Sequence, residues 1–150
     1  MTRRMDYNAA TPAGVKALGG VYGHIMQSGL PKALVDLAYL RVSQINGCAY
    51  CIDMHSRDLL KGGLAVEKLV LVAVWRDAGD LFSDREQAAL AWAESVTRVA
   101  DTGIPDADYL WAASQFQGNE LADLTYAIGL MNAFNRFGVA FRSIPAAAKA

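Results

Sequence analysis

The sequence has little net charge and no long apolar run. Its 14 basic and 15 acidic residues give a formal charge of −1, so it lacks the positive field with which proteins bind nucleic acids or anionic membranes. It contains no stretch of about 18 apolar residues, as a membrane-spanning helix requires, and no apolar segment follows Arg3-Arg4 as in a signal peptide. We therefore expect a cytoplasmic protein with neither nucleic acid nor membrane partners.

The sequence also lacks segments in which apolar and polar residues alternate for long enough to form a strand. Apolar residues instead recur at intervals of three and four, as in amphipathic helices. A length of 150 residues favours one domain. The sequence therefore predicts a single all-α domain over residues 1–150, with its core over about 7–141 and frayed termini, including the alanine-rich tail after Pro145.

Turn and capping residues divide the chain into helices. Pro12, Pro31 and Pro105 stand at helix starts, glycines follow several apolar repeats, and Ser83 with Glu86 forms a capping box. The expected helices cover about residues 12–29, 31–46, 48–61, 65–75, 84–96, 105–118 and 119–141, with a loop over 76–82.

Apolar residues make up 53% of the chain and charged residues only 19%. This is slightly more apolar surface than one small domain needs to bury. We therefore expect a homo-oligomer.

Both cysteines and one of the two histidines lie within residues 48–55. In a helix, Cys48 and Cys51 stand at i and i+3, with their Cβ atoms about 5–6 Å apart, close enough for a disulfide to form and break. His55 lies four residues beyond Cys51 on the same face, where it can exchange a proton with the sulfur directly or through one water. In a reducing compartment such a cysteine pair is more often catalytic or metal-binding than structural.

Asn46-Gly47 supplies a reason for these thiols to be reactive. This turn dipeptide ends the preceding helix and places Cys48 in the first turn of the next, where free backbone N–H groups and the helix dipole favour an anion. Such positions lower the pKa of a cysteine from about 8.5 to roughly 3.5–7.5. The segment therefore predicts a redox-active dithiol.

Asp36 is the one acidic residue of the helix that precedes the cysteines. If the two helices form an antiparallel hairpin about residue 47, Asp36 lies about 16 Å back along one arm and His55 about 12 Å along the other. Asp36 could then orient His55 and stabilise its cation, forming a carboxylate–histidine–thiol relay. A solvated acid at the foot of the helix is an alternative of equal weight.

Three other polar residues stand out. His24 is interpreted as a surface or hydrogen-bonded histidine. Asn132 and Asn135 lie in an apolar helix and, if buried, need hydrogen-bond partners. We expect those partners to come from the protein, with contact to substrate as the alternative.

Residues Leu40–His55 closely resemble the core motif of the alkylhydroperoxidase D-like proteins, within the carboxymuconolactone decarboxylase family. The likeness continues through residues 73–76, 82–92 and 131–136 and so covers the chain from about Tyr7 to Phe141. It implies an all-helical bundle with the CxxC pair at the start of a central helix, assembled into trimers or hexamers. It also implies cofactor-independent reduction of alkyl hydroperoxides.

On the pattern of this family, Cys51 attacks the peroxide with the help of His55 and Asp36, and Cys48 resolves the sulfenic acid to a disulfide. A dithiol reductant, either a lipoyl protein or a thioredoxin-like protein, would then restore the thiols. The sequence departs from the pattern at Asp36, where the family usually has glutamate, and at Tyr50, where alkylhydroperoxidase D has histidine. A tyrosine, with a reference pKa of about 10, cannot shuttle protons near neutral pH as histidine can, so the relay is expected to be weaker.

Four alternatives remain. The lactone decarboxylation that names the family is disfavoured because those members do not depend on a CxxC pair. A metal site would use Cys48, Cys51 and His55, but a closed zinc site normally needs four ligands, and only His24 could supply the fourth. The pair could instead serve as a non-enzymatic redox switch in an oligomer. The last alternative is a pair of buried, inert cysteines.

Overall fold

The computed structural model describes residues 2–149, and within this range the chain is helical and contains no strand. The predicted all-α class is confirmed. The α-helices are α1 (Tyr7–Ala10), α2 (Pro12–Gln27), α3 (Lys32–Asn46), α4 (Ala49–Lys61), α5 (Val66–Leu71), α6 (Asp84–Thr97), α7 (Val99–Thr102), α8 (Asp106–Gln115) and α9 (Glu120–Ala140). Three 3₁₀ segments, η1 (Val72–Asp77), η2 (Gly79–Leu81) and η3 (Ala146–Lys149), complete the described chain.

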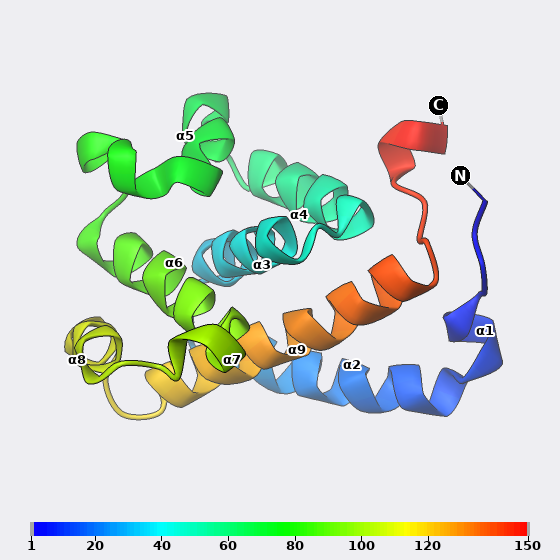
Figure 1. Cartoon of the computed structure of the whole chain (residues 1–150), viewed down its shortest axis with the longest axis horizontal. Coiled ribbons are helices and arrows are strands. Elements are labelled where there is room, and N and C mark those ends of the chain that lie inside the picture. Colours follow the sequence, from blue (N-terminus) through cyan, green and yellow to red (C-terminus); the bar gives the residue numbers. More distant parts are fainter. Residues whose placement is uncertain (1, 150) are drawn as a thin grey trace.

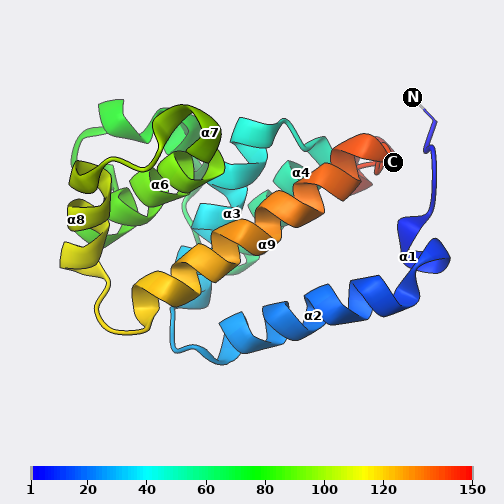
Figure 2. The same cartoon turned by 60° about the horizontal axis from the view of Figure 1, so that its bottom comes forward.

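Helix α3 lies at the centre of the bundle and packs against α4, α6 and α9 (Figure 1). Its side chains from Leu34 to Leu40 are all buried. Helix α2 runs along α9 (Figure 2). Every residue of this stretch except Asp36 is apolar, which accounts for the central position of this part of α3.

The turn between α3 and α4 forms as the sequence predicts. Gly47 adopts a left-handed conformation (φ 67°), and its N–H bonds back to the last turn of α3. Cys48 is the N-cap of α4, and its sulfur accepts a hydrogen bond from the N–H of Cys51 at 3.4 Å. The two helices pack side by side as a hairpin, which brings residues before and after the turn together.

The prediction of a single helix over residues 65–75 is wrong. The α-helix ends at Leu71 and continues as η1, inside which Val74 has a non-helical conformation. β-Branched residues are weak helix formers, and three residues per turn place both Val72 and Trp75 in the core. The Trp75 indole N–H also donates to Glu94 of α6 at 3.1 Å, which holds η1 in place. The loop expected over 76–82 consists largely of the end of η1 and of η2.

Short elements were also missed at the ends of the chain. The sequence did not predict α1, whose N-cap Asp6 accepts hydrogen bonds from the N–H groups of Asn8 and Ala9. The tail expected to be frayed instead forms η3 beside α4, where Ala147 N–H donates to Asp53 at 3.3 Å. The predicted domain also includes residues 1 and 150, which lie outside the described residues. No helix within 2–149 has the length and apolar character of a membrane span.

Candidate active site

Cys48 and Cys51 form a disulfide at the start of α4, with their Cα atoms 5.3 Å apart. The structure thus confirms that the CxxC spacing allows the two sulfurs to bond. Both residues are buried, with 1% and 3% of their surface exposed. A disulfide at this position can be reduced to thiols that face the N–H groups of the first helical turn, which favour the thiolate.

Helix α9 covers the disulfide at Gly138. A Cβ atom at this position would lie 2.7 Å from the sulfur of Cys48 and 3.5 Å from that of Cys51. Only glycine therefore allows α9 to approach this closely. Sequence reasoning missed Gly138 because nothing in the apolar pattern of α9 distinguishes it from Gly129.

His55 lies on α4 one turn after Cys51 and is buried with it. Its Nδ1 is 3.9 Å from Oδ1 of Asp36, and neither ring nitrogen has a hydrogen-bond partner among residues 2–149. Burial lowers the pKa of His55 below its ordinary 6.5, although Asp36 opposes the shift. The imidazole is therefore mainly neutral near pH 7 and able to accept a proton.

Asp36 faces His55 across the α3–α4 hairpin, so the predicted proximity of these two residues is confirmed. The alternative of a solvated acid is wrong, because Asp36 is only 6% exposed. Its second oxygen accepts a hydrogen bond from Lys32, one turn earlier on α3. This hydrogen bond is also the main reason why the pKa of Lys32 is raised. The i,i+4 spacing of Lys32 and Asp36 was a signal for this ion pair that sequence reasoning did not use.

Tyr39 completes the buried surroundings of His55. The two rings lie 5.1 Å apart between centroids. The Tyr39 hydroxyl is buried without a hydrogen-bond partner in the described chain, and burial raises its pKa. Tyr39 follows Asp36 by three residues on α3, and this spacing would have placed it on the same face.

Tyr50, which stands between the cysteines, is 36% exposed. Its side chain lines a cavity of about 250 Å³ together with Arg3, Tyr7 and Asn8 of the N-terminal segment. Burial raises the pKa of Tyr7, and Tyr50 adds to the shift. Tyr50 therefore contacts the N-terminal segment at the surface, whereas His55 and Asp36 lie in the interior.

An amide network joins the end of α3 to α9. Asn46 Nδ2 donates to Oδ1 of both Asn132 and Asn135 at 2.9 Å, and Asn135 Nδ2 donates to Ser43 Oγ at 3.0 Å. The expectation that the protein itself satisfies Asn132 and Asn135 is confirmed. Because Asn46 stands two residues before Cys48, the network also fixes the turn that leads into the disulfide.

His24, the second histidine, is hydrogen-bonded to Asp123 at 2.8 Å, and 60% of its side chain is exposed. The interpretation as a surface or hydrogen-bonded histidine is confirmed. In the part of the chain that the structure describes, no three His, Cys, Asp or Glu side chains are grouped so that they could hold a metal ion.

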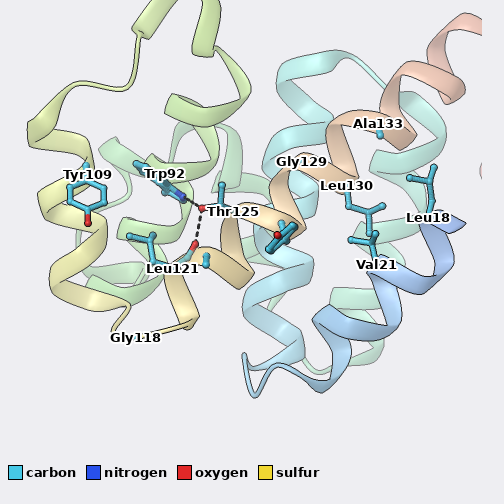
Figure 3. Close-up of a pocket in the computed structure, with 12 residues that line it drawn as sticks. Leu18, Val21, Trp92, Tyr109, Gly118, Leu121, Thr125, Gly129, Leu130 and Ala133 are labelled. Carbon is cyan, nitrogen blue, oxygen red and sulfur yellow. Dashed lines mark hydrogen bonds between the residues drawn. The ribbon is translucent and has the colours of Figure 1, made fainter.

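A larger cavity, of about 670 Å³, lies elsewhere and is called the apolar groove below (Figure 3). Its lining comes from α2, α6, α8, the turn after α8 and α9: Leu18, Val21, Trp92, Tyr109, Gly118, Leu121, Ala122, Thr125, Tyr126, Gly129, Leu130 and Ala133. The Thr125 hydroxyl in it accepts from Trp92 Nε1 at 2.9 Å and donates to the Leu121 carbonyl at 2.7 Å. None of the four predicted site residues lines this groove.

The sequence model of the carboxymuconolactone decarboxylase family matches residues 12–95, more than half of the chain. The chain belongs to this family. The Bacillus subtilis protein YdfG, itself uncharacterized, is 31% identical over 140 residues, which are 93% of this chain and 95% of YdfG. The resemblance inferred from the CxxC segment is confirmed.

Solved structures agree with this assignment. A protein of unknown function from Agrobacterium tumefaciens, named as a candidate antioxidant defence protein AhpD, superposes with a TM-score of 0.92 at 36% identity over 96% of this chain and 98% of its own. The protein therefore has the alkylhydroperoxidase D-like fold with a CxxC pair. The debrominase Bmp8 is similar in fold (TM-score 0.79, 93% of this chain and 75% of Bmp8), but at 19% identity the likeness concerns the fold alone.

Proposed function

We propose that the protein is a thiol-dependent peroxidase that reduces alkyl hydroperoxides with its Cys48–Cys51 pair. The observation that carries this proposal is the disulfide at the start of α4 beside a buried histidine and carboxylate. The similarity to the Agrobacterium protein, whose name refers to antioxidant defence, supports the same role.

In the proposed reaction the Cys51 thiolate attacks the terminal oxygen of the hydroperoxide. An S–O bond forms, the O–O bond breaks, and the alkoxide takes up a proton and leaves as an alcohol. The Cys48 thiolate then attacks the sulfur of the Cys51 sulfenic acid, so that an S–S bond forms and hydroxide leaves as water. The two thiols lose two electrons, which reduce the peroxide.

His55 is the proposed general base and acid. A neutral imidazole can accept the thiol proton of Cys51 and later return it to the alkoxide, which requires no metal or organic cofactor. Asp36 would stabilise the imidazolium formed in between. The 3.9 Å between Asp36 Oδ1 and His55 Nδ1 exceeds a hydrogen bond, so Asp36 acts through its field or through a bridging water.

An external dithiol would restore the thiols. One thiol of the reductant attacks the Cys48–Cys51 disulfide and forms a mixed disulfide. Its second thiol then releases the protein, so that the reductant leaves as a disulfide and its two electrons restore both cysteine thiols. We propose a lipoyl protein or a thioredoxin-like protein as this partner. The excess of apolar surface still predicts a homo-oligomer as the working form.

The experiment is dihydrolipoamide-dependent consumption of tert-butyl hydroperoxide, with protein thiols counted before and after peroxide. We expect turnover by the wild type, none by Cys51→Ser, and a single oxidation without turnover by Cys48→Ser. His55→Gln should lower kcat/KM roughly a hundredfold or more, the usual contribution of a general base. His24→Gln, which changes the exposed histidine, is the matched control and should retain activity.

Two results would contradict the proposal in different ways. If the wild-type thiols oxidise to the disulfide without turnover of any peroxide, the pair acts as a redox switch and not as a peroxidase. If Cys48→Ser turns over like the wild type, the disulfide is not part of the cycle.

A further inference from the structure

A third pocket, of about 410 Å³, adjoins the turn that leads into the CxxC pair and is called the arginine pocket below. It is lined by the end of α3 and the C-terminal half of α9: Asn46, Asn135, Arg136, Val139 and Ala140. Asn46 stands two residues before Cys48, and Val139 directly follows Gly138, the residue that touches the disulfide. The arginine pocket therefore lies at the turn that leads into the disulfide, whereas the lining of the apolar groove includes no residue of this turn.

Arg136 gives this pocket a positive charge. Its Nη1 donates to the carbonyl of Asn132 at 2.7 Å and to Asn132 Oδ1 at 3.1 Å, both neutral acceptors. No carboxylate among residues 2–149 forms an ion pair with Arg136. The guanidinium is held in one orientation by α9 and still has its charge available for a ligand.

Arg4 places a second guanidinium close by. Its Nη1 donates to the carbonyl of Ala140, a lining residue, at 3.1 Å, and its backbone N–H donates to Phe141 at 3.0 Å. Like Arg136, it forms no ion pair with any carboxylate of the described chain. Two unpaired cations beside a partly apolar wall of Val139 and Ala140 match a ligand that has a carboxylate attached to a hydrocarbon body.

We propose that the arginine pocket binds the carboxylate of an organic hydroperoxide and that Arg136 is its anchor. This inference deepens the proposed function, on which it rests, by naming the substrate class. The planar guanidinium can hold a carboxylate through two parallel hydrogen bonds, which fixes its orientation as well as its position. With the carboxylate held there, the rest of the same molecule lies at the turn that leads into Cys48.

The apolar groove is the contrasting case. It is the larger cavity, but its lining contains no charged side chain. A carboxylate moved into it would lose its hydration without gaining a cation. Volume alone would favour the groove as the substrate site, whereas charge and position favour the arginine pocket.

The test compares two substrates of nearly equal shape: cumene hydroperoxide with a para-carboxylate, and its methyl ester. We expect wild-type kcat/KM to favour the acid by about tenfold, the size of one charge-assisted hydrogen bond on a partly exposed site. Arg136→Gln should bring the ratio close to one and leave kcat/KM for the ester within about twofold. Arg136→Lys should retain part of the preference.

Arg98→Gln is the control, because Arg98 is also exposed and lies at the start of α7. It changes the net charge equally and should leave the ratio unaltered. The inference would be overturned if the wild type and Arg136→Gln preferred the acid over the ester equally, or if the wild type preferred the ester. The ester activity reports separately on the proposed peroxidase function.

A binding measurement decides the question even without turnover. The alcohol that corresponds to the acid substrate, cumyl alcohol with a para-carboxylate, should bind the oxidised wild type in calorimetry and bind Arg136→Gln at least about tenfold more weakly. Equal binding to both proteins, or to neither, would contradict the arginine pocket whatever the peroxidase assay shows.

Discussion

The protein has two histidine–aspartate pairs, one between α2 and α9 and one between α3 and α4, and they differ in their surroundings. His24 and Asp123 make the shorter contact, 2.8 Å, but the His24 side chain is 60% exposed and lies near the apolar groove. His55 and Asp36 are 3.9 Å apart, but both are buried, and His55 follows Cys51 by one helical turn. Hydrogen-bond geometry alone would therefore select His24 and Asp123, whereas the proposed relay uses His55 and Asp36.

Burial is the reason to expect a larger effect from the longer contact. In the interior an ion interacts more strongly with its neighbours than it does in water. A proton moved onto His55 changes the field at the disulfide, whereas a proton on exposed His24 is largely screened by solvent. A buried histidine one helical turn from a cysteine is therefore a better reason to propose a site than cavity size or hydrogen-bond length.

The sharpest test of this comparison replaces one aspartate of each pair. We expect Asp36→Asn to lower kcat/KM for tert-butyl hydroperoxide by roughly ten- to a hundredfold, because the imidazolium loses its buried counter-charge. Asp123→Asn should change it by less than about twofold. Steady-state kinetics with dihydrolipoamide measures both. Similar losses in the two variants would break the distinction between the pairs.

Two glycines of α9 allow the disulfide region and the apolar groove to be compared by their effect on stability. Gly138 touches the disulfide, whereas Gly129 lines the groove with nothing within 4 Å of its added Cβ. Gly129→Ala should stabilise the protein by about 0.5–1 kcal/mol, since alanine is the better helix former. Gly138→Ala should instead destabilise the oxidised protein, because overpacking against the disulfide costs about 1–3 kcal/mol, which is more than alanine gains as a helix former. Urea unfolding of the two oxidised variants gives the difference.

Reduction provides a control for Gly138→Ala. A free Cys48 thiol can rotate away from the new methyl group, but a bridged sulfur cannot. The loss of stability should therefore shrink when the same variant is unfolded with its thiols reduced. An equal loss in both redox states would mean that the methyl group disturbs something other than the disulfide.

The lowered pKa of His55 predicts a pH dependence of stability. In the unfolded chain His55 binds a proton near pH 6.5, whereas in the folded protein the same residue binds it only at lower pH. Between these two values the unfolded state holds more protons, so the free energy of unfolding falls as pH falls below 6.5, by at most about 1.4 kcal/mol per pH unit. His55→Gln should remove this part of the slope in urea titrations between pH 7.5 and 5.5. An unchanged slope would show that His55 is not the group responsible.

Much of the candidate site could be predicted because it depends on local spacing. Cys48, Cys51 and His55 share one helix, and Gly47 fixes the hairpin that brings Asp36 to His55, so turn chemistry and helical rise were sufficient. Gly138 and the cations of the arginine pocket were missed because contacts from α9 and from the N-terminal segment depend on packing between distant parts of the chain. The break at Leu71 was missed because Trp75 and Glu94, 19 residues apart, stabilise it.

The apolar groove yields the prediction with the smallest effect on catalysis. The groove combines wide, uncharged apolar surface with the 60% exposed Tyr126, and exposed apolar patches of this kind commonly form interfaces. We therefore expect Tyr126→Glu to lower the mass of the expected homo-oligomer in light scattering and to change kcat/KM by less than about twofold. Lys16→Glu, an exposed change on α2 outside the groove lining, is the control and should leave the mass unaltered. If Tyr126→Glu lost activity as Asp36→Asn does, the apolar groove would belong to the working site.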